Sequence, residues 1–362
     1  MARKRIPQNE GVRVTVGVDT HKDTHVASAK DQLGRRLGER VVPTTPAGYR
    51  DLLAWARGLG HIETFGLEGT GSYGAGLARY LCREGESVVE VIRPNRQARR
   101  RNGKSDPADA DAAASAVLSG DTSGVPKAGD ATVEMIRALR VARSSAIKAR
   151  TQASNAMKAL VVTAPEQLRE PLRGLSRTRL VRTCARMRPG ELVDPTAATK
   201  AALRSLAVCH EALEAEVKAL DAQIGPLIAK AAPKLLAMFA VGPASAGALL
   251  VAAGDNPDRL RSEAAFSMLC GSSPIEASSG KVTRHRLNRG GDRQANAALY
   301  RIVVVRLRWD QATRDYMGRR TAEGKSRAEV IRCLKRYVAR EVYAVLATVG
   351  ARKAVGADNA VA

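Results

Sequence analysis

The sequence predicts a mixed α/β domain at its N-terminal end, a central region of long helices and a mostly helical C-terminal domain. Short β-rich and helical runs alternate from Gly11 to about Val91. Apolar residues then recur at alternating spacings of three and four, the pattern of long paired helices. Because 362 residues exceed one typical domain, we expect domains at 11–130, 131–232 and 233–350, with a disordered tail at 351–362.

The N-terminal domain is predicted to begin with three strands and to add two more strands between helices. Thr45 and Pro46 suit the N-cap and first turn of a helix that ends near Gly58, and residues 74–84 form the next helix. The expected strands, which alternate with these helices, are 12–19, 25–30, 36–42, 64–68 and 87–92.

The central region is predicted to contain two long helices. The seam of the first is Leu139, Ala142, Ala146, Ala149, Ala153, Ala156 and Leu160, and that of the second is Leu213, Val217, Leu220, Ile224 and Leu227. A coiled-coil hairpin and ordinary helices in a bundle fit these seams equally well. Residues 165–195, which contain Pro and Arg, are expected to hold the turn or a small helical insertion.

The C-terminal region is predicted to be mostly helical. Residues 234–255 contain two apolar helical stretches around a tight Gly-Pro turn, which has the shape of a helix-hairpin-helix. A Ser- and Gly-rich loop at 271–281 and a basic stretch at 281–293 follow. An Arg-studded helical pattern then continues to about Val349.

The composition indicates a nucleic-acid partner. The chain has 59 Lys and Arg against 36 Asp and Glu, a formal charge of +23, and such a surplus favours binding to phosphate backbones. The five cysteines have no C-x-x-C spacing, so no zinc site is predicted. Aromatic residues are only 3%, which argues against the base-stacking platforms of single-strand and RNA-recognition folds and predicts binding through charge and backbone. No apolar run reaches the roughly 20 residues of a membrane span. We expect a cytoplasmic, nucleoid-associated protein with no membrane partner.

Four carboxylates lie where a metal-dependent nuclease needs them: Asp19, Glu68, Asp106 and Asp109. The first two follow apolar strands, and the other two lie three residues apart on a predicted helix, about 60° around its axis. Mg²⁺ prefers oxygen ligands, and attack on a phosphodiester is assisted by metal ions held between converging carboxylates. Asp111 is expected to point elsewhere, at about 140° from Asp106.

Each of these acids has a simpler interpretation by itself. An Asp after a strand is usually a turn residue, and one that opens a helix, as Asp106 does, is usually a cap. The ordered set of four is what favours a metal site. His21, Asp23 and His25, which follow the first strand, are interpreted as solvated turn residues, and the alternative is that one of them assists the site.

Three segments carry a family resemblance. VGVDTHKDTHVAS, TFGLEGTGSYG and RPNRQARRRNGKSDPADADAAA resemble, in order and spacing, the RuvC-like (RNase H-like) domain of the DEDD transposases of the insertion-sequence "one-ten" family. These enzymes are bridge-RNA-guided recombinases. In the match, Asp19, Glu68, Asp106 and Asp109 occupy the D, E, D and D positions. The resemblance implies a site for Mg²⁺, with Mn²⁺ as the alternative.

The second half extends this resemblance. FAVGPASAGALL is similar to the family's helix-hairpin-helix, with Ala240 where its first Gly usually stands, and the serine loop and NRGGDRQANAALYRIVVVR resemble the segments that follow. Ser279 aligns with the serine that serves as covalent nucleophile, and Ser278 is the alternative. The resemblance implies donor and target DNA, a guide RNA and a homo-oligomer, dimer or tetramer, as partners.

Basic residues adjoin both parts of the predicted chemistry and are interpreted as guides for the nucleic-acid backbone. A charge run is usually a solvated face, but these residues lie beside carboxylates that would otherwise repel a phosphate. They are Arg96, Arg99, Arg100, Arg101 and Lys104 before the Asp pair, and Lys281, Arg284, Arg286, Arg289 and Arg293 around the serine.

Two other functions remain compatible with the sequence. One is a RuvC-like, Mg²⁺-dependent endonuclease that resolves branched DNA by hydrolysis, in which Ser279 is structural. The other is a non-catalytic DNA- or RNA-binding protein whose acids merely cap helices. The first predicts free nicked ends, whereas the second predicts that Asp19→Ala and Glu68→Ala have no effect.

Overall fold

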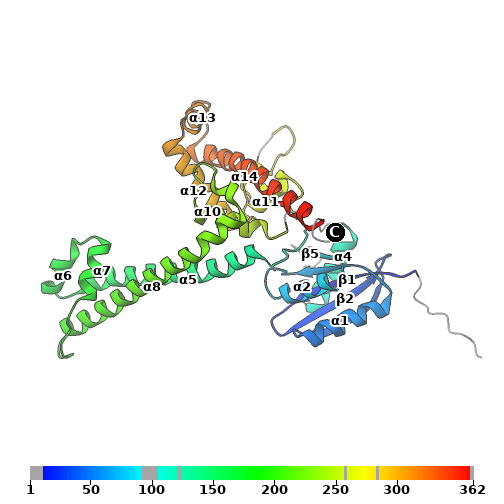
Figure 1. Cartoon of the computed structure of the whole chain (residues 1–362), viewed down its shortest axis with the longest axis horizontal. Helices are drawn as coiled ribbons and strands as arrows, with labels where there is room; N and C mark the ends of the chain where they lie inside the picture. The colour runs from blue at the N-terminus through cyan, green and yellow to red at the C-terminus, as the bar shows by residue number, and fades with distance from the viewer. Residues whose placement is uncertain are drawn as a thin grey trace, which may run out of the picture. The chain divides into compact units, whose positions relative to one another are not determined.

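The computed structural model describes residues 11–91, 105–120, 124–129, 131–256, 259–282 and 285–358, with the backbone alone for 348–358. The chain forms two compact units (Figure 1). The first contains the N-terminal sheet and residues 253–266, and the second consists of 131–252 and 267–349.

The first unit is built on a five-stranded sheet with the order β3-β2-β1-β4-β5. The first three strands pair as antiparallel neighbours, and β4 and β5 are parallel to β1 and to each other. All five expected strands are therefore confirmed. Their bounds are β1 Arg13–Thr20, β2 Thr24–Asp31, β3 Arg36–Pro43, β4 His61–Glu68 and β5 Val88–Val91.

Helices α1 (Pro46–Leu59) and α2 (Ala75–Arg83) pack on one face of this sheet. Thr45 is the N-cap of α1, as predicted, and its Oγ1 accepts a hydrogen bond from the Gly48 backbone N–H at 3.2 Å. The apolar core between these layers includes the buried residues Val16, Val18, Phe65, Leu67, Leu52 and Leu77. In β1 the even-numbered residues therefore face α1 and α2, and the odd-numbered residues face the opposite side.

Residues 253–266 belong to the first unit because their polar side chains bind its backbone. Asn256 Nδ2 donates to the carbonyl oxygen of Pro126 at 2.7 Å, and Arg259 Nε donates to that of Val125 at 2.9 Å. Residues 233–252 share the second unit with the long helices. The division into three domains at 130/131 and 232/233 stays a prediction.

The second unit contains two long helices, α5 (Thr132–Thr163) and α8 (Pro195–Ala231), that pack along each other (Figure 1). Arg143 of α5 forms an ion pair with Asp221 of α8 at 2.5 Å, and Arg150 forms one with Glu214. Residue numbers rise along one helix as they fall along the other, so the helices are antiparallel. Among the described helices, none is both long and apolar enough to cross a membrane.

The predicted seam of α8 is largely correct, whereas that of α5 is correct only in part. Val217, Leu220 and Ile224 are buried in α8. In α5, Ala146 and Ala153 are buried, but Ala142 and Ala149 are exposed. The remaining seam positions of α5 are larger residues such as Ile136, Met157 and Val161. An Ala repeat is a weak signal because a methyl group buries little area on either side of a helix.

Two short helices, α6 (Glu166–Arg173) and α7 (Arg177–Ala185), lie at the end of this antiparallel pair (Figure 1). Their buried Leu168 and Leu180 pack with Met157 of α5 in one apolar cluster. The region predicted to hold a turn or a small helical insertion is therefore a helical insertion, whose apolar core is shared with the ends of α5 and α8.

The rest of the second unit is mostly helical, as predicted. Its last helix extends to Asp358, past the residue at which we expected a tail to begin. The serine loop and the basic stretch are joined by a short antiparallel hairpin, which the sequence did not predict. The elements from residue 233 onward, whichever unit they belong to, are α9 Pro233–Leu236, α10 Pro243–Ala253, α11 Glu263–Leu269, β6 Ile275–Glu276, β7 His285–Arg286, α12 Arg293–Trp309, α13 Gln311–Ala322 and α14 Arg327–Asp358.

Ala240, between α9 and α10, has a left-handed backbone conformation with φ of 67°. This conformation costs a non-glycine residue about 1–2 kcal/mol, and glycine avoids the cost at an entropic penalty of about 0.5–1 kcal/mol. Ala240→Gly is therefore expected to stabilise the chain by about 1 kcal/mol and to raise its melting temperature by a few degrees. Ala237→Gly, at a right-handed position in the same turn, should lower it. Equal destabilisation by both changes would contradict this account.

Candidate metal centre

Asp19 and Glu68 end neighbouring parallel strands. Val18 of β1 is the register partner of Leu67 of β4, so the next residue of each strand, Asp19 and Glu68, lies side by side. Their side chains face the same side of the sheet as Gly17 and Gly66, two residues earlier. That side is covered by helix α4 (Asp106–Leu118), not by α1 and α2.

Helix α4 (Asp106–Leu118) lies unusually close to the sheet because both surfaces are made of small residues. A Cβ atom added to Gly17 would lie 2.2 Å from the carbonyl oxygen of Ala110, and one added to Gly66 would lie 2.4 Å from Val117 Cγ2. Ala110, Ala113 and Ala114 are fully buried in this contact. The close approach brings the first turn of α4 to the strand ends that carry the carboxylates.

The first turn of α4 supplies two more acids. Ser105 occupies the N-cap position with an extended backbone, so the helix begins at Asp106. Asp109 follows one turn later and is almost fully buried, whereas the Asp106 side chain is 53% exposed. Asp111 points elsewhere, as predicted, because its carboxylate is 2.8 Å from Lys30 Nζ on β2.

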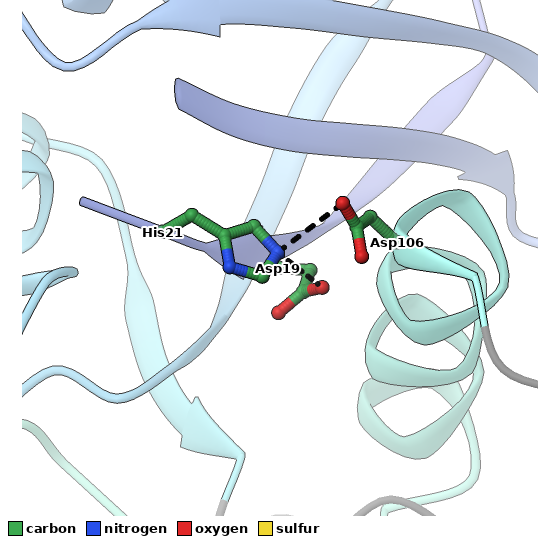
Figure 2. Close-up of side chains that lie close together, drawn as sticks. All are labelled: Asp19, His21 and Asp106. Atoms are coloured by element: carbon green, nitrogen blue, oxygen red, sulfur yellow. Dashed lines mark hydrogen bonds and ion pairs between the residues drawn. The ribbon is translucent and has the colours of Figure 1, made fainter. Parts of the chain in front are cut away.

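Asp19, His21 and Asp106 converge on one point, and Figure 2 shows the imidazole between the two carboxylates. The Nε2 atom of His21 is 3.1 Å from Asp19 Oδ2 and 3.4 Å from Asp106 Oδ2. One ligand atom of each residue lies within 4.8 Å of the others. Glu68 and Asp109 are outside this group of three, although Asp109 is close enough to act on Asp19 electrostatically.

The pKa of Asp19 is raised, chiefly because burial penalises its charged form. The neighbouring carboxylates of Asp109 and Asp106 raise it further, and His21 opposes them by charge and by its hydrogen bond. A cation bound between these carboxylates would relieve the same repulsion. The electrostatics of the site therefore favour a positively charged ligand.

Of the three residues interpreted as solvated turn residues, His21 fits the alternative that one of them assists the site, and His25 was misjudged. His21 belongs to the carboxylate cluster, and its spacing of two from Asp19 on an extended chain was the signal that could have shown it. His25 is fully buried in β2, where its ring stacks on Tyr49 at a centroid distance of 5.8 Å and burial lowers its pKa. Asp23 is exposed, in agreement with the prediction.

The donor atoms fit a divalent cation. Carboxylate oxygens are the ligands that Mg²⁺ and Mn²⁺ prefer, and a neutral imidazole nitrogen is a further ligand for transition metals. Around an ion with bonds of about 2.1 Å, ligand atoms at right angles lie about 3.0 Å apart. The observed separations of 3.1 and 3.4 Å between His21 Nε2 and the two carboxylates are of this size.

Ser279 lies near the tip of the short hairpin in the second unit. Its backbone N–H donates to the carbonyl oxygen of Val282, and the reverse bond is also made, each at 3.1 Å. Gly280, at the turn, has φ of 56°, a left-handed conformation that suits glycine. The side chain of Ser279 is exposed, so its hydroxyl is accessible to a large substrate.

The neighbouring serines differ in their surroundings. Ser278 is exposed, like Ser279. Ser272 is buried, and its Oγ donates to the carbonyl oxygen of Ser267 at 3.2 Å, which is a structural role. Of these three serines, Ser278 and Ser279 at the far end of the hairpin are the ones with exposed side chains.

Only some of the predicted backbone-guiding residues can be placed. Lys281, Arg286, Arg289 and Arg293 are exposed around the hairpin. Asp292 caps the helix that Arg293 begins, since its carboxylate accepts from the backbone N–H groups of Gln294 and Ala295. Arg284 and the whole first group, Arg96, Arg99, Arg100, Arg101 and Lys104, lie outside the described residues.

Comparisons with known proteins identify the family. A model of DEDD transposases of the IS110 type matches residues 16–164, and a model described as transposase IS116/IS110/IS902 family matches residues 232–318. An insertion element IS110 uncharacterized 43.6 kDa protein from Streptomyces coelicolor is 31% identical over 145 residues. That match covers 39% of this chain and 36% of the relative, so it spans about a third of the relative's length. Because the two family matches together cover well over half of its residues, the chain belongs to the IS110 family of transposases.

Proposed function

We propose that this chain is the recombinase of an insertion sequence, which cuts DNA strands and rejoins them by phosphoryl transfer. The observation that carries this proposal is the convergence of Asp19, Asp106 and His21, with Asp109 beside them, inside the segment matched by the DEDD transposase model. A carboxylate cluster at the end of two parallel strands is where α/β folds place their chemistry.

We further propose that the first unit has the RuvC-like (RNase H-like) fold. The strand order β3-β2-β1-β4-β5, with three antiparallel strands followed by two parallel ones, supports this proposal. In the second unit, α9 and α10 flank the left-handed turn at Ala240, which supports the proposed helix-hairpin-helix.

The protein ligands of the proposed metal site come from three elements of the first unit. Asp19 and His21 come from the end of β1 and the turn after it, and Asp106 and Asp109 from α4, while Glu68 approaches from β4. Mg²⁺ bound there, with Mn²⁺ as the alternative, would supply positive charge against the charge that develops on a phosphodiester during transfer. Burial of Asp19 and Asp109 excludes water from one side of the site and strengthens its electrostatic interactions.

Ser279 is the proposed nucleophile. Its Oγ would form a bond to a DNA phosphorus as the bond to the sugar oxygen breaks, and the hydroxyl proton would end on that departing oxygen. The resulting phosphoserine bond keeps the phosphodiester energy for rejoining. A serine hydroxyl needs an activating neighbour, so the proposal requires the carboxylate site and Ser279 to meet on one phosphodiester. Ser278 is the second candidate.

The proposed partners follow from the charge and from the family. A surplus of +23 suits donor and target DNA and a guide RNA, which would select sequences by base pairing while the protein binds backbone. A homo-oligomer, dimer or tetramer, would supply more than one nucleophile for exchange between two duplexes. The exposed Lys281, Arg286, Arg289 and Arg293 are proposed to guide the backbone near Ser279.

The proposed function is tested by incubating the purified chain with Mg²⁺, the RNA transcribed from DNA flanking its gene, and donor and target DNA. Joined donor–target strands are the expected product. Free nicked ends without joining would instead identify a hydrolytic endonuclease, for which the carboxylate cluster alone is sufficient.

His21→Ala is expected to weaken binding of Mn²⁺, a spectroscopically visible substitute for Mg²⁺, by about tenfold, because groups in or next to a ligand set typically contribute 10- to 100-fold. Electron paramagnetic resonance of free Mn²⁺ measures this directly, without an activity assay. The matched control is His61→Ala, which removes an exposed imidazole from the opposite end of β4. Unchanged Mn²⁺ binding in the His21 variant would remove His21 from the proposed site.

A further inference from the structure

A cationic pocket lies in the second unit, separate from the carboxylate cluster. Its volume is about 590 Å³, and its walls are residues 271–274 and 285–288 at the base of the hairpin, with α13 and α14 on the other side. The tip of the same hairpin carries Ser279. A ligand in this pocket would therefore be held by the element that presents the proposed nucleophile.

The charge lining this pocket is strongly positive. Arg286 comes from the hairpin, Arg320 from α13, and Arg332, Arg336 and Arg340 from α14. Arg320 forms an ion pair with Glu323 of the same segment. Among the described residues that line the pocket, the acid is Glu329, whose carboxylate accepts from the Ser326 Oγ at 2.6 Å and lies 3.9 Å from Arg332. The lining therefore keeps a positive surplus, which suits a polyanion.

The α14 arginines repel one another, which lowers the stability of the helix when no anion is bound. Arg332, Arg336 and Arg340 are spaced by four residues and so share one helix face, where like charges destabilise a helix. Lys335, which precedes Arg336 in the chain, is 8% exposed, and its Nζ donates to Asn296 Oδ1 at 2.9 Å. Burial and Arg332 lower the pKa of Lys335, and burial and Arg340 lower that of Arg336. An anion between these groups would remove the repulsion.

Two aromatic rings complete the wall of the pocket, although aromatic residues are only 3% of the chain. Tyr316 and Tyr337 meet edge to face at a centroid distance of 5.6 Å, and Tyr337 is 46% exposed. The guanidinium of Arg340 lies over the Tyr337 ring at 5.8 Å. Phosphate-binding cations beside an exposed aromatic ring are the combination that binds unpaired nucleotides, whose bases have free faces for stacking.

We propose that this pocket holds an unpaired nucleic-acid strand, with phosphates against Arg332 and Arg336 and a base against Tyr337. The volume is that of a small-molecule site, which admits one or a few nucleotides and not the width of a duplex. The inference rests on the proposed function for the presence of nucleic acid. It adds where a strand is held, and places it at the foot of the hairpin that bears Ser279.

Fluorescence anisotropy of the full chain tests this pocket. The probes are a labelled single-stranded RNA of about 12 nucleotides, single-stranded DNA of the same sequence and the matching DNA duplex, titrated in EDTA at several salt concentrations. The variants are Arg332→Gln with Arg336→Gln, and Tyr337→Leu. The matched control is Arg327→Gln with Arg301→Gln, which removes the same charge from exposed positions outside the pocket. Thermal melting establishes that each variant is folded.

The pocket pair is expected to weaken single-strand binding about tenfold and to reduce the salt slope by about 1.4, or about 0.7 for each lost phosphate contact. Tyr337→Leu should weaken single strands about fivefold and leave the duplex unchanged. If the RNA probe binds more tightly than the single-stranded DNA, the natural ligand of the pocket is RNA. If the single-stranded DNA binds more tightly, the ligand is DNA. Equal losses in the control pair, or equal losses for the duplex, would overturn the inference. Binding is measured in EDTA and is therefore independent of metal-dependent cutting. A chain that binds in this way but does not cleave DNA when Mg²⁺ is supplied would overturn the proposed function alone.

Discussion

Asp19→Asn is expected to reduce DNA strand cleavage by at least about 10³-fold, because it removes a charged ligand from a site whose metal supplies several kcal/mol to phosphoryl transfer. Asparagine has the same shape as aspartate, and its carbonyl oxygen can still accept the His21 hydrogen bond. The loss of activity therefore should not come from a loss of structure. Cleavage of a supercoiled substrate in the presence of Mg²⁺ measures the effect.

Stability measurements separate loss of the metal from misfolding. Burial, Asp109 and Asp106 raise the pKa of Asp19 in the folded state, so its ionisation costs stability. This cost is absent below the unfolded pKa and is complete once the pH exceeds the raised folded pKa. Asp19→Asn should thus melt at or above the wild-type temperature in metal-free buffer at neutral pH. Mg²⁺ should stabilise the wild type but not the variant.

Asp23→Asn is the matched control for this experiment. Asp23 is an exposed carboxylate in the turn after β1, four residues from Asp19, and it is outside the cluster. Its replacement should leave both cleavage and Mg²⁺ stabilisation unchanged. Full activity of Asp19→Asn would instead favour the non-catalytic binding protein, in which these acids only cap helices and form turns.

The N-terminal sheet was largely predictable because its signals are local. Strand residues such as Val14, Val16 and Val18 alternate with smaller residues, and Thr45 and Pro46 mark a helix start whatever surrounds them. The order and spacing of the acids along the sequence, Asp19 and Asp106 among them, likewise indicated the site. Their convergence depends on α4 packing against Gly17, a long-range contact that single-residue patterns do not encode.

The remaining features were missed for similar physical reasons. His25 was misjudged because its burial depends on stacking against Tyr49 of α1, and not on its neighbours in the chain. The association of residues 253–266 with the first unit depends on hydrogen bonds from Asn256 and Arg259 to a distant segment. The cationic pocket likewise combines a hairpin with α14, whose residues are far apart in sequence. Patterns within one element cannot show such combinations.

Ser279→Ala is expected to abolish covalent attachment of the protein to DNA, because alanine has no oxygen to bond to phosphorus. The exposed position of Ser279 near a hairpin tip means that the change should leave the fold and DNA binding intact. Denaturing gels of the reaction with labelled DNA measure the adduct. Ser272→Ala is a poor control because that hydroxyl is buried and hydrogen-bonded, whereas Ser278→Ala removes an exposed hydroxyl from the adjacent residue.

The most direct measurement is to isolate the covalent protein–DNA complex, digest both components and locate the remaining nucleotide by mass spectrometry. The proposed chemistry predicts a phosphate ester on Oγ of Ser279, formed by the wild type and Ser278→Ala but not by Asp19→Asn or Ser279→Ala. A nucleotide on another residue, an adduct that persists in Ser279→Ala, or cleaved DNA with no adduct at all would contradict it.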